Sequence, residues 1–387
     1  MKRIIGYSRY IMIYGGYYFA MALFSVLISV YLMDKGQGAV EVSFLVSAAS
    51  VMSMVFQPVI GMLQDIGNQK TVTVAILLIS AGTGILFSTG NTYGLLVILY
   101  GVTMALINSA NPYIEMIAMK SPYSYRSIRI WGSIGYATGA QVCGIIYEAI
   151  SPESNYYIFA AFIAMAAWGV AAVKGMDSAE DRENRKEENG YKKAVLGNGM
   201  FWKYMILASV FYGVTNLNST YLPVYYQENG LSVTMASTVL FLATLMELPV
   251  IFTAHRYMNR LSNTLLLGAL FGAMILQFAA YVLMPVTVVR MMATIILKSS
   301  VTMAYIMVNM KVVSSVVSPR YQMSALTLIS ALGKNLTTIV MQNISGVLVD
   351  TLTTKGLYMV LLGLVILGFV FVWMFRIPTS ETEKMAF

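Results

Sequence analysis

Long apolar segments separated by short polar ones run along the whole chain. Twelve apolar runs are each close to the ~20 helical residues that cross the hydrocarbon core of a bilayer. Most of the connections between them contain only a few residues. The pattern predicts twelve membrane-spanning helices, numbered here in chain order: 9–33, 42–63, 71–90, 93–118, 128–150, 155–173, 203–226, 234–254, 263–284, 287–310, 322–350 and 356–375.

One connection differs from the others. It includes the sequence DSAEDRENRKEENGYKK, which is highly charged and nearly free of large apolar side chains. Such a composition is typical of a solvated linker. We therefore predict an N-terminal six-helix bundle over residues 1–173, a cytoplasmic linker over 174–202, a C-terminal six-helix bundle over 203–376 and a cytoplasmic tail over 377–387.

The basic residues predict the orientation of these helices. Of 25 Lys and Arg residues, only Lys35, Arg290 and Lys355 lie in odd-numbered loops, and most of the others lie at the termini or beside even-numbered loops. Loops rich in Lys and Arg remain in the cytoplasm. We therefore expect a multi-pass protein of the cytoplasmic membrane with both termini in the cytoplasm. The net charge of +8 does not indicate a nucleic-acid partner, because no soluble domain collects these charges on one face.

Composition excludes several classes of protein. Hydrophobic residues make up 58% of the chain and charged residues 11%, whereas soluble proteins carry about 25% charged residues. One Cys and one His exclude a disulfide framework and a His-rich metal site. No Walker motif, nucleotide-binding loop or catalytic triad is present. We expect a protein without enzymatic activity, cofactor or metal, present as a monomer in the lipid bilayer.

The two halves of the chain share short matches in the same order. VYLMDKG ends span 1 and VYYQENG ends span 7; QPVIG lies in span 2 and LPVIF in span 8; GIIYE ends span 5 and GVLVD ends span 11. Two parallel six-span repeats around a central cavity are a transporter architecture, with the substrate site near the middle of the membrane. The spacing of Gly132, Gly135 and Gly139 on span 5 predicts close helix packing.

The loop between spans 2 and 3 reads GMLQDIGNQK and contains Gly61, Asp65, Gly67 and Lys70. Asp65 follows the end of a span, where it can accept hydrogen bonds from a neighbouring helix N-terminus and pair with Lys70. Such a contact would hold two spans together in one conformation. The alternative is an ordinary short turn with a solvated carboxylate.

This loop, G-x-L-x-D-x-G-x-x-K, resembles the loop signature of the major facilitator superfamily. FQPVIGMLQDIGNQK, YIEMIAMK and RIWGSIGYATGAQVCGII are similar to stretches of its oligosaccharide:proton symporters, the lactose permease group. The resemblance implies an all-α membrane protein of twelve transmembrane helices in two pseudo-symmetric six-helix bundles. It also implies transport by alternating access.

Five ionisable residues lie inside the predicted spans: Glu115, Arg129, Glu247, Lys298 and Lys334. A charge near the bilayer centre is costly, so it faces a partner or a water-filled cavity. Glu115 and Arg129 lie at similar depth on adjacent antiparallel spans and could pair. The set has one excess positive charge. An anionic substrate would balance it, and so would a lysine that loses its proton or turns toward water.

The resemblance gives several of these residues a role. It implies that Arg129 binds sugar hydroxyls, that Tyr136 stacks on the sugar ring, and that Glu247 links sugar binding to proton movement. It also implies that Lys334 belongs to a charge network of the C-terminal half, which here includes Lys298.

The chain departs from the family pattern at several of these positions. Asn111 replaces the carboxylate that partners the arginine, and Glu115 matches a second acidic position one turn further along. Asn216 and Asn218 take the place of acidic residues on span 7, and Val301 and Ala304 replace a histidine and a glutamate on span 10. Proton coupling therefore does not simply follow from the resemblance.

These features together predict a secondary active transporter of a small polar solute. Sugar or glycoside symport with H⁺ is the expected activity, with Arg129, Tyr136, Asn111, Glu115, Glu247, Asn216 and Asn218 at the substrate site. An organic-anion or drug transporter and an uncoupled facilitator are the alternatives within transport. A membrane sensor that binds a solute without moving it is the alternative from another class.

Overall fold

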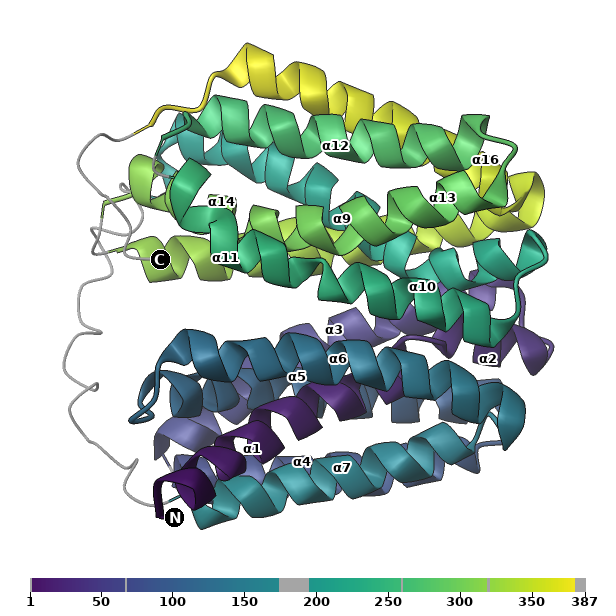
Figure 1. The fold of residues 1–387 in the computed structure, drawn as a ribbon, viewed down its shortest axis with the longest axis vertical. Coiled ribbons are helices and arrows are strands. Elements are labelled where there is room, and N and C mark those ends of the chain that lie inside the picture. The colour runs from purple at the N-terminus through teal and green to yellow at the C-terminus, as the bar shows by residue number, and fades with distance from the viewer. Residues whose placement is uncertain (1, 67, 174–194, 259, 319–320, 380–387) are drawn as a thin grey trace. The chain divides into compact units, whose positions relative to one another are not determined.

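A computed structural model describes residues 2–66, 68–173, 195–258, 260–318 and 321–379 (Figure 1). All regular elements in these ranges are helices. By length and hydropathy, 9 helical segments of the described chain could cross a membrane. One of them, Ala325–Phe375, has 51 residues and changes direction at Thr353, so it holds two predicted spans. Helices also cover the fifth and seventh predicted spans, so the structure agrees with the twelve-helix prediction.

The helices of the first half follow the predicted spans closely. Span 1 is divided into two helices, and each of the next five spans is one helix. Their bounds are α1 Lys2–Ser25, α2 Ile28–Asp34, α3 Ala39–Ile66, α4 Gln69–Ser88, α5 Tyr93–Met119, α6 Tyr125–Ala149 and α7 Ser154–Ala172.

The helices of the second half are less regular. Spans 8, 10 and 11 each contain a break or a π-helical segment, labelled η. The bounds are α9 Gly199–Glu228, α10 Val233–Leu245, α11 Glu247–Met258, α12 Asn263–Leu283, α13 Thr287–Ala293, η3 Thr294–Lys298, α14 Ser299–Val316, α15 Gln322–Leu328, η5 Ile329–Leu336 and α16 Thr337–Phe375.

Residue contacts divide the chain into two compact units. Unit 1 consists of Met1–Glu180 and Thr220–Leu245, and unit 2 consists of Asp181–Ser219 and Met246–Phe387. The helix α10 belongs to unit 1, although it follows the predicted linker in sequence, because it packs along α6. Residues 174–194, most of that linker, lie outside the described residues, so the predicted domain boundaries stay a prediction.

Close helix contacts through glycine organise unit 1. The helix α1 packs along α6 and α7, α3 packs on α5, and α4 packs on both α5 and α7. A Cβ atom at Gly135 would lie 3.0 Å from the Cα and carbonyl carbon of Gly15 on α1, and one at Gly139 would lie 3.1 Å from the carbonyl carbon of Phe19. Only glycine permits so close an approach, and this confirms the packing predicted from the spacing of small residues on span 5.

Unit 2 has its own core and helix caps. The helix α12 packs on α14 and α16, and α11 packs on α14. The buried Lys311 donates from its Nζ to the carbonyl oxygens of Met258 and Leu261, each at 2.6 Å. These carbonyls lie at and just beyond the C-terminus of α11, where a cation is favourable. Lys311 therefore fixes the end of α11 against α14.

The shared turn after spans 1 and 7 supports the predicted repeat. Gly36 and Gly230 have φ angles of 81° and 83°, in the left-handed region that favours glycine. The residue after each glycine donates its backbone N–H to a carbonyl five residues earlier: Gln37 to Leu32 and Leu231 to Tyr226, both at 3.0 Å. This is the Schellman arrangement of a helix C-terminus, and it occurs at equivalent positions of the two halves.

Span 8 is two helices, not the single predicted helix over 234–254. The helix α10 ends at Leu245 and α11 begins at Glu247. Pro249 explains the break, because proline has no N–H to bond the carbonyl of residue 245 and its ring clashes with that carbonyl. Ser300 of α14 donates its hydroxyl to the carbonyl oxygen of Met246 at 3.2 Å, so the residue between the helices has a polar partner.

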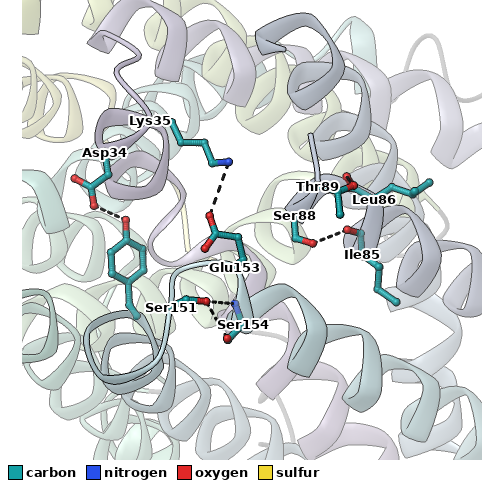
Figure 2. Close-up of polar contacts among 10 residues, drawn as sticks. Asp34, Lys35, Ile85, Leu86, Ser88, Thr89, Ser151, Glu153 and Ser154 are labelled. Carbon is teal, nitrogen blue, oxygen red and sulfur yellow. Dashed lines mark hydrogen bonds and ion pairs between the residues drawn. The ribbon is translucent and has the colours of Figure 1, made fainter. Parts of the chain in front are cut away.

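Polar contacts gather at the end of unit 1 where α2 meets the loop before α7 (Figure 2). The hydroxyl of Tyr147 donates to Asp34 Oδ2 at 2.5 Å, and Lys35 Nζ lies 3.9 Å from Glu153 Oε1. Glu148, one residue further along α6, accepts hydrogen bonds at the N-terminus of α10 from Ser232, Val233 and Thr234. These contacts hold the ends of α2, α6, α7 and α10 together.

Candidate functional site

Arg129 and the residues around it form a polar cluster inside unit 1, which we call the Arg129 cluster: Tyr18, Asn111, Glu115, Tyr125 and Arg129. The side chains come from α1, α5 and α6. The guanidinium of Arg129 lies over the ring of Tyr18, with its Cζ 5.4 Å from the ring centroid. Tyr18 and Arg129 are both partly buried. A guanidinium over an aromatic face gains a favourable cation–π interaction.

Glu115 is bonded to tyrosines and not directly to Arg129. Tyr18 and Tyr125 donate their hydroxyls to its two oxygens, at 3.1 Å for Oε1 and 2.8 Å for Oε2. The Tyr18 hydroxyl also lies 3.1 Å from Asn111 Oδ1, so its one proton is shared between the two side chains. Glu115 and Arg129 attract each other electrostatically, but no ion pair within 4.0 Å joins these two described residues. The predicted direct pair is therefore not formed.

The guanidinium of Arg129 keeps its donors available. Among the described residues, no hydrogen bond or ion pair is made by this group; its contacts are the Tyr18 ring and an approach to Gly132. Five N–H donors in a planar fork are thus free for a bound molecule. The Arg129 cluster can present a cation, a neutral amide and tyrosine hydroxyls to the same solute.

Tyr18 and Tyr125 are site residues that the sequence interpretation missed. A signal was present, because Tyr14 and Tyr18 are four residues apart on span 1, and Tyr125, just before the predicted start of span 5, is four residues from Arg129. Residues at this spacing lie on the same face of a helix. Tyrosine is so frequent in this chain, with 26 copies, that the spacing alone singles out no pair.

Tyr136, the predicted stacking residue, lies seven residues after Arg129 on α6. This spacing puts it on the same helix face, about 10 Å further along the axis. Its side chain is partly buried, and it interacts electrostatically with Tyr100 of α5. The structure thus places Tyr136 in line with Arg129 but outside the Arg129 cluster, and its stacking role stays a prediction.

The two asparagines of span 7 join helices within unit 2. Asn216 Oδ1 accepts a hydrogen bond from Gln342 Nε2 at 2.8 Å, and the buried Asn218 accepts one from the Tyr358 hydroxyl at 3.1 Å. Both partners belong to α16. The structure gives each asparagine an interhelical hydrogen bond, and their predicted contact with substrate is untested.

Glu247 is in the first turn of α11, directly after the break in span 8. The N-terminus of a helix carries partial positive charge and favours a carboxylate. Glu247 is partly buried and interacts electrostatically with Lys298, which ends η3 on span 10. The structure therefore brings these two predicted members of the charge network together in unit 2.

Both predicted intramembrane lysines occur in π-helical segments. Lys298 is the last residue of η3, and Lys334 is in the middle of η5. Such segments are rare in proteins overall, and many of those that occur lie at functional sites. The side chain of Lys334 is exposed, and within the described chain it has neither a hydrogen bond nor an ion pair. An exposed ammonium at membrane depth requires water or an anion.

The predicted loop motif is described only in part. Gly67 and the side chain of Asp65 lie outside the described residues, and a Cβ atom added at Gly61 would meet nothing within 4 Å. Lys70 Nζ donates to the carbonyl oxygen of Val173, at the end of α7, at 2.8 Å. The predicted Asp65–Lys70 contact is thus untested.

Comparison with known families decides the identity. A profile described as "MFS_1 like family" matches residues 7–360, which is most of the chain. The chain belongs to this family. It is therefore a transporter of the major facilitator superfamily, as the loop motif predicted, and not an enzyme. It moves a small solute across a membrane through a multi-pass helical fold.

Two relatives are similar along most of their length. The chain is 24% identical to the maltose permease of Geobacillus stearothermophilus over 328 residues, covering 82% of each chain. It is 23% identical to the lactose permease of Klebsiella oxytoca over 371 residues, covering 88% of this chain and 87% of the permease. The predicted likeness to the lactose permease group is confirmed at this level.

Solved structures show the same fold. The nucleoside transporter NupG has a TM-score of 0.77 at 15% identity, covering 95% of this chain and 97% of that one. A D-xylose-proton symporter has a TM-score of 0.72 at 14% identity, covering 98% and 99%. At these identities the likeness establishes the major facilitator fold of the chain.

Proposed function

We propose that this transporter carries a sugar or glycoside across the cytoplasmic membrane together with protons, by alternating access, with both of its termini in the cytoplasm. The observation that carries the proposal is the Arg129 cluster. A guanidinium with free donors lies inside the membrane-spanning part of unit 1, beside an aromatic ring, an amide and tyrosine hydroxyls.

This combination suits a sugar. A planar guanidinium can donate two parallel hydrogen bonds to adjacent hydroxyl groups. Asn111 adds amide donors and acceptors, and tyrosine rings supply the apolar face that packs against the C–H face of a pyranose. Tyr136, on the same face of α6, extends this surface. The maltose and lactose permeases among the relatives support a sugar as the solute, and NupG keeps nucleosides as the alternative.

Glu247 is the proposed proton-binding site. Its carboxylate, in the first turn of α11, interacts with Lys298, the residue directly before α14, and α11 packs on α14. Binding of a proton would remove that interaction, so protonation and the arrangement of α11 and α14 are linked, and each affects the other by the same free energy. The D-xylose-proton symporter among the structural neighbours supports coupling to protons.

The test is transport by purified protein in liposomes. We expect uptake of maltose, lactose or a simple glycoside against its gradient when a proton gradient is imposed, and loss of that accumulation when an uncoupler is added. Glu247→Gln should abolish accumulation but keep exchange of labelled for unlabelled sugar, because exchange needs only the neutral form that Gln mimics. Glu41→Gln, in the first turn of α3, is the matched control and should accumulate sugar normally.

Each other outcome identifies an alternative. Sugar uptake that never exceeds the external concentration would indicate an uncoupled facilitator. Transport of nucleosides, drugs or organic anions without any sugar would reject the sugar assignment. Binding of sugar with neither uptake nor exchange would indicate a solute sensor.

A further inference from the structure

We propose that the transported solute carries an acidic group, a carboxylate or a phosphate, which pairs with Arg129. The inference rests on the proposed function, because it specifies the chemistry of the sugar or glycoside that the Arg129 cluster binds. It is carried by the distribution of charges and hydrogen bonds in the two units.

Arg129 has no directly paired acid among the described residues. Its guanidinium is partly buried and permanently charged, and among the described residues it has no hydrogen-bonded carboxylate. Its nearest polarised contact is the face of the Tyr18 ring, 5.4 Å from Cζ. An aromatic face attracts the cation but accepts no N–H hydrogen bond of ordinary strength. The N–H donors of the planar guanidinium therefore have no hydrogen-bond acceptor among the described residues while no solute is bound.

Glu115, the acid nearest to Arg129 in the cluster, is already held by two hydroxyl groups. Each oxygen of Glu115 already accepts a tyrosine hydroxyl, from Tyr18 and from Tyr125. Moving the carboxylate onto Arg129 would break both bonds and leave the Tyr18 hydroxyl with Asn111 as its acceptor. The other neighbour of the Tyr18 hydroxyl, Asn111, is neutral. Glu115 thus offsets the charge of Arg129 at a distance. It does not occupy the place of an acid that pairs directly with the guanidinium.

Unit 2 points to an acid independently, because its named intramembrane residues carry two positive charges, on Lys298 and Lys334, and one negative charge, on Glu247. Glu247 interacts with Lys298, and Lys334 has no ion pair among the described residues. Hydroxyl groups of a neutral sugar would satisfy hydrogen bonds of these cations but not their charge. An acidic group supplies both at once, since charge-assisted and bidentate pairs with Arg are stronger than neutral ones. An acid is therefore the solute that best fits each of the two sets taken by itself.

The experiment compares sugars that differ only in charge. D-glucuronic acid and D-glucose share a ring, and D-glucose 6-phosphate tests phosphate in place of carboxylate. Ligand-induced thermal shifts of the purified protein give apparent affinities, and exchange in liposomes gives transport. We expect one of the two acids to bind at least tenfold more tightly than glucose, and the acid that does so identifies the group.

Two variants shift the preference in opposite directions. Asn111→Asp adds a carboxylate that shares Tyr18 with Arg129, so it should weaken binding of the acid at least tenfold more than it weakens binding of glucose. Glu115→Gln keeps one carbonyl oxygen as an acceptor for the tyrosines and removes a competing charge, so it should strengthen binding of the acid. Asn91→Asp, the same change at an exposed loop position, should alter neither.

The outcomes separate this inference from the proposed function. Equal or tighter binding of glucose than of both acids overturns the inference and leaves a neutral-sugar transporter standing. An Asn111→Asp protein that melts normally but keeps its preference for the acid also overturns the inference, because Arg129 is then not the pairing group. Failure of all three compounds to bind or exchange counts against both the inference and the sugar assignment.

Discussion

Substituting Gly135 by Ala should destabilise the protein although Ala favours helices. The added Cβ would lie 3.0 Å from the Cα and carbonyl carbon of Gly15, and closer still to its oxygen. Carbon atoms pack best at about 3.5–4.0 Å, so α1 must move away from α6 by at least about half an ångström. The obstacle is backbone on both sides, and no side chain can rotate to relieve it.

The magnitude follows from two opposing effects. Adding a methyl group to a close-packed interior typically costs about 1–3 kcal/mol. Replacing Gly by Ala in the middle of a helix gains about 0.5–1 kcal/mol. The difference is a net loss of up to about 2.5 kcal/mol at Gly135, and about 1 kcal/mol at the centre of the two ranges. For a chain of this size we expect the apparent Tm to fall by about 1–3 °C.

The assay is thermal unfolding in detergent, followed by the fluorescence of the native tryptophans. Gly82→Ala is the matched control, because Gly82 is exposed in the middle of α4 and a Cβ there meets nothing within 4 Å. That variant should melt at the wild-type temperature or about 1 °C higher. A Gly135→Ala protein that gains stability as Gly82→Ala does would refute the close approach of α1 and α6.

Three further predictions test separate features. Arg129→Lys should lose ligand-induced thermal stabilisation while its own Tm changes little, since an ammonium cannot reproduce the planar fork; a fall in Tm with binding intact would indicate a structural role. Glu148→Gln removes a carboxylate from the N-terminus of α10, a contribution of about 0.3–1 kcal/mol, so deuterium exchange of Val233 and the following turn should rise about two- to fivefold; unchanged exchange would contradict this cap. Thr353→Gly should raise Tm by about 1–2 °C, because Thr353 has φ 66° and a non-glycine residue there costs about 1–3 kcal/mol; destabilisation would show that the Thr353 side chain has a role of its own.

The helical pattern of the chain could be predicted because a membrane imposes it. Every backbone polar group in a bilayer must be satisfied within the segment, so long apolar runs become helices at almost the positions that hydropathy indicates. The repeat was also readable, since the glycines at 36 and 230 end their helices in the same geometry. The grouping of α10 with unit 1 could not be predicted from the sequence, because it depends on long-range packing against α6.

The sequence predicted three members of the Arg129 cluster but neither its two tyrosines nor its connections. Arg129 and Glu115 were identified from their position in the spans and Asn111 from the family resemblance, and all three contact Tyr18 in the structure. The expected Arg129–Glu115 pair fails because two tyrosine hydroxyls hold the carboxylate instead. Which of several donors a carboxylate selects depends on side-chain geometry, which spacing along one helix does not determine.

The helix irregularities of unit 2 show where its charged residues must face. Glu247 follows a break caused by Pro249, whereas Lys298 and Lys334 lie in π-helical segments that no proline explains. A break or a π turn leaves backbone groups with weaker partners, and in a membrane such backbone is tolerated only where it is buried in protein or lines a water-filled space. The charged side chains must also be buried in protein or face water, because lipid does not solvate them. Two independent constraints therefore select the same positions.

A π segment also differs from an α-helix by one inserted residue. Losing that residue from the turn rotates everything beyond it by about 100°. Conversion of η5 to an α-helix would therefore change the direction of the Lys334 side chain relative to the part of the helix beyond it.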